Sequence, residues 1–340
     1  MTLPANTKKV WGAMLFILLP VFCILVSLTL GVYRISVPHV FQILLGKMTG
    51  NIPEEIKAIE ISMVWDVRLP RILGAVLAGC GLSIAGGVFQ ALFSNPLADP
   101  YTLGVSNGAG FGAALAIVLS FSSMMIQLSA LCFGIVSVGL TFLLAGRKRR
   151  APVTMILSGM LVSAFFASLV SLLKFTADPQ EKLPQIVYWL MGSLTGLRYS
   201  KLLVVLPGFL TAVVVLHLYR WRINILSMGN REAKSMGLNV RRDRTMVILA
   251  STLLTALVVS IAGIIGWVGI VIPHLARMIV GPDFRKLMPV SASLGTCFLL
   301  IIDDICRTLT AQEIPIGVVT GIIGIPIFLY FILREKVSWA

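Results

Sequence analysis

Residues 68–110 read "RLPRILGAVLAGCGLSIAGGVFQALFSNPLADPYTLGVSNGAG" and hold two apolar, glycine-rich runs joined by a short polar turn. The first run, 69–93, is long enough to cross a bilayer as a helix, which takes about 20 residues. Pro70 suits a first helical turn, where its missing N–H costs nothing. Asn95 and Asp99 each precede a proline, so the turn is stiff. The stretch predicts two membrane-spanning helices joined by a rigid hairpin.

Similar apolar runs fill the rest of the 340-residue chain, which is 57% hydrophobic and 12% charged. Soluble domains carry about 25% charged residues. We therefore expect an all-α membrane protein that forms a single transmembrane domain over residues 1–340, with about ten transmembrane helices. The predicted spans are 11–32, 69–93, 103–121, 126–146, 153–174, 202–219, 245–263, 265–280, 288–304 and 316–333.

Glycine is concentrated in particular runs, above all in 69–93. Small residues let helix backbones approach closely in lipid, so these glycines predict a tightly packed bundle. Those of the second span are Gly74, Gly79, Gly81, Gly86 and Gly87.

The distribution of charge sets the orientation. With ten spans both termini lie on one side, and that set of helix ends carries 18 basic and five acidic residues, against ten basic and nine acidic on the other. Cytoplasmic ends carry the excess of Lys and Arg. The termini are therefore predicted to be cytoplasmic, and the net charge of +14 needs no nucleic-acid partner.

Catalytic, metal-binding and cofactor-binding patterns are missing from the sequence. The five cysteines are scattered without a CxxC, the three histidines show no ligand spacing, and no GxxxxGK[ST] phosphate loop occurs. We expect no cofactor, no metal and no enzymatic activity.

Two pairs of charges stand at the predicted outer ends of helices. Arg68 and Arg71 share one helix face, where they can anchor the helix at the membrane interface or grip carboxylates in bidentate fashion. Asp303 and Arg307, four residues apart, suit a local ion pair. A proton relay through Asp303 and Asp304 is disfavoured, because no deeper carboxylate follows. Residues 33–67 are predicted as an external loop, and 176–200 as an outer segment with a short helix that lies in the interface or re-enters the membrane.

The polar segment 225–244, "ILSMGNREAKSMGLNVRRDR", is predicted to be cytoplasmic. Glu232, Ala233 and Met236 can form a short helix bounded by Gly229 and Gly237. A solvated loop is the alternative. Exposed methionines at such a joint favour contact with another protein that must move.

Long blocks of the chain resemble one family. They are the opening stretch, "YWLMGSL" (188–194), "GIIGWVGIVIPHLARMIVGPDFRKLMP" (263–289) and "EIPIGVVTGIIGIPIF" (313–328). With these blocks the chain resembles the permease subunits of ABC importers for iron chelates, haem and cobalamin, which are type II importers with ten spans per subunit. The resemblance implies an ATP-driven permease that imports a bulky metal chelate, such as a ferric siderophore, haem or cobalamin, across the bacterial cell (inner) membrane.

The resemblance also implies partners and sites. Two permease subunits, expected here as a homodimer, form a pore at their interface, with two cytoplasmic ATPase subunits and an extracytoplasmic binding protein. The implied sites are binding-protein docking at Arg68, Arg71 and Arg307, a cytoplasmic gate at Asn95, Leu97 and Thr154, and ATPase coupling at Gly229, Asn230, Glu232, Ala233, Met236 and Gly237. The alternative is an ion-coupled secondary transporter, which would need carboxylates within the membrane.

Overall fold

A computed structural model describes residues 5–146, 152–310 and 312–334, and these residues form helices and turns without a β-strand. The all-α prediction is confirmed. The two chain ends and the basic run 147–150, all predicted to be cytoplasmic, lie outside the described residues.

Each predicted span coincides with a helix of this described structure. Six of these helices are long and apolar enough to cross a membrane, and the other four contain shorter apolar stretches. The ten helices are α1 (Ala5–Thr29), α4 (Leu69–Phe93), α5 (Val105–Val118), α6 (Ser123–Ala145), α7 (Pro152–Thr176), α9 (Tyr199–Ser227), α11 (Val240–Ala262), α12 (Val268–Val280), α13 (Phe284–Thr308) and α14 (Ile316–Arg334).

The predicted span 288–304 is too short, because α13 extends from Phe284 to Thr308. Its last turns carry Asp303, Asp304 and Arg307, and a count of apolar residues stops at such charges. The helix continues because these side chains are paired inside the protein.

The segment 33–67 is not the plain loop that was predicted. It contains α2 (Val37–Thr49), α3 (Ala58–Ser62) and a π-helical turn, η1 (Met63–Arg68), that runs directly into α4. Ser36 caps the start of α2 through its side chain, which accepts a hydrogen bond from the His39 amide, and Gly50 ends the helix with a φ of 81°. The predicted helix within 176–200 is confirmed as α8 (Lys182–Leu190).

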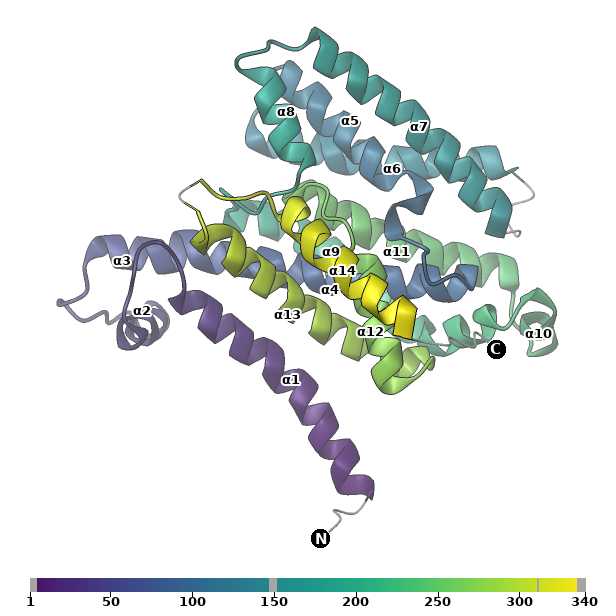
Figure 1. Ribbon diagram of the computed structural model, residues 1–340, viewed down its shortest axis with the longest axis horizontal. Coiled ribbons are helices and arrows are strands. Elements are labelled where there is room, and N and C mark those ends of the chain that lie inside the picture. Colours follow the sequence, from purple (N-terminus) through teal and green to yellow (C-terminus); the bar gives the residue numbers. More distant parts are fainter. Residues whose placement is uncertain (1–4, 147–151, 311, 335–340) are drawn as a thin grey trace.

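The bundle is arranged around α4. Figure 1 shows α5, α6, α7 and α8 gathered on one side, while α13 and α12 flank α4 on the other. In the most apolar part of the continuous helical stretch 58–93, which contains α4, 78% of the residues are buried, against 28% for α7. The short helices α2 and α3 lie at the end of the bundle opposite α10 (Asn230–Ser235), so the two ends of the molecule carry different short helices.

Glycines in α4 set its distance from two neighbouring helices. A Cβ added at Gly79 would lie closer than 3.0 Å to the carbonyl of Gly295 in α13, and one added at Gly86 would meet the backbone of Gly269 in α12 in the same way. Contact between backbones replaces side-chain interdigitation at both crossings. The close approach of α4 and α13 brings the start of α4 next to the end of α13.

Alanine at Gly86 should therefore destabilise the bundle, because backbone must move to admit the methyl group, and overpacking costs about 1–3 kcal/mol. Gly139 in α6 is the matched control, since a Cβ added there has nothing within 4 Å. Gly139→Ala should be neutral or slightly stabilising in a helix. Thermal unfolding of both variants in the same detergent tests this, and equal midpoints would contradict the packing account.

Candidate functional site

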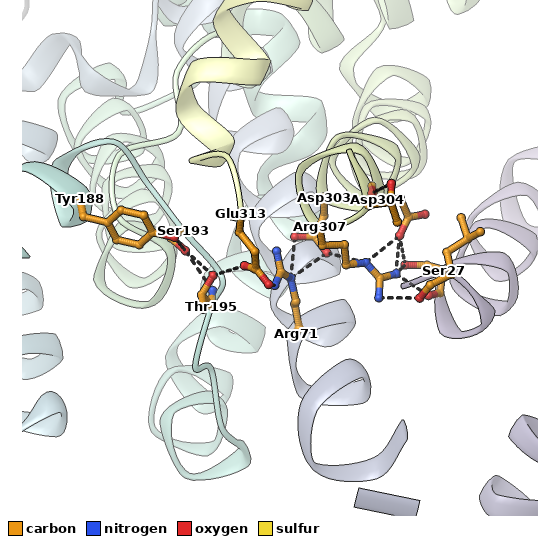
Figure 2. Close-up of polar contacts among 11 residues, drawn as sticks. Ser27, Arg71, Tyr188, Ser193, Thr195, Asp303, Asp304, Arg307 and Glu313 are labelled. Carbon is orange, nitrogen blue, oxygen red and sulfur yellow. Dashed lines mark hydrogen bonds and ion pairs between the residues drawn. The ribbon is translucent and has the colours of Figure 1, made fainter. Parts of the chain in front are cut away.

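Arg71 lies at the centre of a polar cluster (Figure 2) at the end of the bundle that carries α2 and α3, which the predicted orientation makes the outer end. It follows Pro70 in the first turn of α4 and points toward α13. Its Nε donates to both carboxylate oxygens of Asp303, at 2.9 and 3.1 Å, and its Nη1 donates to both oxygens of Glu313, at 2.7 Å. One guanidinium thus joins two helices and the connection between α13 and α14.

Arg307 forms the second half of this cluster, one helical turn beyond Asp303. It is hydrogen-bonded to Asp304 and lies 3.7 Å from Asp303. Its Nη2 also donates to the side chain of Ser27 in α1 at 2.8 Å, and the Ser27 hydroxyl donates to Asp304 at 2.7 Å. The polar contacts therefore run on from α13 to α1.

Arg68 and Arg307 together bind the carbonyl end of α1. Arg68 donates to the carbonyls of Leu28 at 2.7 Å, Thr29 at 3.3 Å and Tyr33, while Arg307 donates to those of Ser27 and Leu30. The last carbonyls of a helix have no partner within the helix, and they form the negative end of its dipole. The two arginines satisfy these carbonyls, which would be costly to leave unpaired where water is excluded.

Glu313 extends the cluster toward α8. It accepts a hydrogen bond from the Thr195 hydroxyl, which in turn accepts one from Ser193 at 2.9 Å. The Ser193 hydroxyl lies 3.3 Å from that of Tyr188 in α8. Burial opposes ionisation of Glu313, but the hydrogen bonds from Thr195 and Arg71 and the charge of Arg71 lower its pKa below the ordinary value. Glu313 is therefore a carboxylate bound to a cation.

The cluster is electrically balanced and largely sealed. Three arginines stand against three carboxylates, and Arg68, Arg71 and Arg307 are 4%, 6% and 6% exposed. We expected these arginines to lie at an outer surface and to bind a partner's carboxylates. The structure instead buries them and gives each of them internal partners. Their burial disfavours the role of interfacial anchors, and docking of a partner's carboxylates at these arginines stays a prediction.

Sequence reasoning missed Glu313, Thr195 and Ser27 as members of the cluster. Glu313 lies in the block "EIPIG", which was quoted for the resemblance without a role for the carboxylate. The local pairing of Arg307 within α13 was recognisable from its spacing, whereas the partners of Arg71 are 232 and 242 residues away in the chain.

The predicted gate residues lie at the opposite end. Asn95 and Leu97 follow α4, and the Asn95 side chain accepts a hydrogen bond from the Leu97 amide at 2.9 Å. This turn leaves Leu97 56% exposed. The 3₁₀ turn η2 (Pro100–Leu103) follows and packs on α7, near whose start Thr154 lies half-buried.

The predicted coupling segment forms α10, and the expected bounding glycines are confirmed by φ values of 122° at Gly229 and 80° at Gly237. Ala233 is completely buried against α9 and α11, so it holds α10 in place and is not available to a partner, contrary to our expectation. Met228 and Met236 are 64% and 51% exposed beside it. Asn230 and Glu232 are exposed as well.

A bundle of ten apolar helices, with a largely buried polar cluster at one end and a short exposed helix at the other, defines a multi-span membrane protein. Comparison with known families makes this specific. The model of the FecCD transport family matches residues 18–334, and the chain belongs to this family.

Individual relatives and a solved structure agree. The chain is 41% identical over 320 residues to the molybdate import system permease protein MolB of Haemophilus influenzae, with 94% of each chain covered. It is 37% identical to an iron chelatin transport system permease protein of Helicobacter pylori, over 83% of this chain and 86% of the relative. A structure described as an inward-facing metal-chelate type ABC transporter covers 97% of this chain and 100% of its own, with a TM-score of 0.85 and 37% identity.

Replacing Arg307 by glutamine should strongly destabilise the protein. The change removes the cation from the buried Asp303 and from Asp304, and breaking a buried pair on one side costs about 3–5 kcal/mol. It also frees carbonyls at the end of α1. Arg34→Gln is the control, because Arg34 is exposed and makes no ion pair among the described residues. The measurement is thermal unfolding together with proteolysis of α1, and a variant as stable as the control would refute the capping role.

Proposed function

We propose that this chain is half of the pore of an ATP-driven importer in the bacterial cell (inner) membrane. Two copies form the pore at their interface. Two cytoplasmic ATPase subunits bind at the end that carries α10, and an extracytoplasmic binding protein docks at the end that carries Arg71. Family membership supports ATPase and permease partners. The predicted cytoplasmic termini agree with α10 facing the ATPase.

The observation that carries this proposal is the construction of α10. A six-residue helix has little stability of its own in water. Here the buried Ala233 seats it between α9 and α11, while the exposed methionines flank it. A hollow of about 380 Å³ lies alongside, lined by residues that include Lys234, Leu238 and Arg241. A short polar helix that is anchored by a buried alanine and flanked by two exposed methionines, beside a hollow, is suited to transmitting movement from a partner.

The cargo that we propose is a bulky metal chelate, such as a ferric siderophore, haem or cobalamin. The relative from Helicobacter pylori and the metal-chelate transporter structure support this class. The identity to MolB favours molybdate as a second candidate. The metal content and absorption spectrum of the copurified binding protein distinguish them: a chelate brings iron or cobalt with an organic ligand, and molybdate brings molybdenum without one.

A secondary transporter is disfavoured because the carboxylates that would carry its coupling ion are already paired. Proton or ion relays need carboxylates that can change partner or charge. The carboxylates in the described spanning helices are Asp243, Asp303 and Asp304, and each is paired with an arginine.

Placing a carboxylate at Met236 should weaken binding of the ATPase subunit at least about tenfold, or about 1.4 kcal/mol, because an apolar contact becomes a buried charge. Glu232→Arg should also uncouple ATP hydrolysis from uptake. Met48→Asp is the control, since Met48 is 81% exposed at the other end of the molecule. Ala233→Trp would unseat α10 and cannot separate contact from folding. Wild-type ATPase affinity and uptake in both Met236→Asp and Glu232→Arg would refute the coupling role.

Cysteine at Leu97 should crosslink to its twin across the two-fold axis and block transport, because a symmetric pore places the same residue of each subunit face to face. The exposed Cys132 must first be replaced by serine. Leu119→Cys is the control, since Leu119 is 53% exposed at the end of α5. Crosslinking and uptake are measured in each nucleotide state. Absence of a Leu97→Cys crosslink in every state would count against a gate at Asn95, Leu97 and Thr154.

A further inference from the structure

The three buried arginines differ in how easily their partners can be exchanged. Arg68 and Arg307 hold backbone carbonyls at the end of α1, and releasing them would leave those carbonyls without partners. Among the residues that the structure describes, Arg71 binds side chains only. Of these, Asp303 is fully buried within α13, whereas the Glu313 side chain is 32% exposed and lies on the connection to α14.

Arg71 also has unused donor capacity. Asp303 occupies Nε and Glu313 occupies Nη1. Nη2 has no hydrogen-bond partner among the described residues, and 8% of the Arg71 side chain is exposed. A guanidinium presents donors in a planar fork that matches a carboxylate in bidentate geometry. A second carboxylate can therefore approach through Nη2 while Glu313 is still bound.

We propose that Glu313 is an internal occupant of the docking site on Arg71, and that a carboxylate of the extracytoplasmic binding protein takes its place when that protein docks. This proposal rests on the proposed function. Arg71 is then the direct docking contact, and Glu313 regulates docking. Arg68 and Arg307 hold the end of α1.

Displacement of Glu313 would be transmitted to the elements beside it. Its carboxylate holds the Thr195 hydroxyl, and α14 begins three residues later. The amides of Ile316 and Gly317 donate to the carbonyls of Gly192 and Met191, both at 3.0 Å. Release of Glu313 removes the side-chain link that keeps this joint against α4, so docking loosens the start of α14 and the segment after α8.

The first test is the affinity of the purified binding protein of the same importer for the permease–ATPase complex in nanodiscs. A site that is open in about one molecule in ten binds with about tenfold lower apparent affinity. Glu313→Gln should therefore tighten binding about three- to tenfold, because the amide cannot compete as a charge. Thr195→Val should act in the same direction but more weakly. Glu54→Gln, at an exposed acid of the 33–67 segment, should change nothing.

Arg71→Lys should weaken binding and abolish the gain from Glu313→Gln in the double variant. Unchanged or weaker binding in both Glu313→Gln and Thr195→Val would overturn the exchange. If the wild type and all variants fail to bind the protein, docking itself is wrong and the exchange falls with it.

The second test reads the displacement directly in the unaltered complex. Addition of the binding protein should raise deuterium exchange at the amides of Ile316 and Gly317, because the bonds to the segment after α8 open more often. The amides of α2 serve as the internal reference at the same end. Protection of Ile316 and Gly317 that is unchanged or increased, with the binding protein bound, would overturn the proposal while leaving the importer function intact.

Discussion

The guanidinium of Arg71, held between Asp303 and Glu313, is the interaction on which the outer half of the structure depends. It can exist only because α4 and α13 approach closely enough for a short carboxylate on one helix to reach an arginine on the other. Gly79 and Gly295 permit that approach by bringing backbone against backbone. The ion pair therefore depends on packing by small residues, because Arg71 and Asp303 can meet only where the glycines let the two helices approach.

The two ends of the molecule handle polar groups in opposite ways. At the outer end, arginines satisfy the carbonyls of α1 and the carboxylates of α13, and the cluster is closed by its own members. At the other end, α10 keeps only Ala233 inside, and its basic side chains and the two methionines that flank it are exposed. The difference agrees with the proposed function, in which the end that carries α10 packs on an ATPase subunit and the end that carries Arg71 keeps its shape until a partner exchanges a carboxylate there.

Much of the fold follows from the sequence because its signals are local. A run of apolar residues predicts a spanning helix wherever it occurs, and paired glycines predict the bounds of α10, so these elements are confirmed close to their predicted positions. The arrangement of the outer cluster is not local. Arg71 and Glu313 are 242 residues apart, and neither shows its partner by spacing. Nor does the sequence show which side chains are exposed. Arg68 and Ala233 were expected at surfaces, but the structure buries both. The helices within 33–67 were missed because they are short: α2 has 13 residues and α3 has five, whereas the apolar runs that predict spanning helices have about 20 residues.

A buried ion cluster is a poor means of stabilisation, since apolar side chains of similar volume often serve as well or better. The outer cluster nevertheless brings six ionisable groups into one sealed place, and its contacts reach α1, α4, α13 and the segments beside α8 and α14. Pairing of charges makes the contacts specific, because a buried carboxylate without its arginine would raise the free energy of the folded protein. It also allows one carboxylate to be replaced by another with little change in local geometry, which packed apolar side chains cannot do. A partly exposed member among sealed ones is therefore the feature that separates an exchangeable contact from a structural one, and in this cluster that member is Glu313.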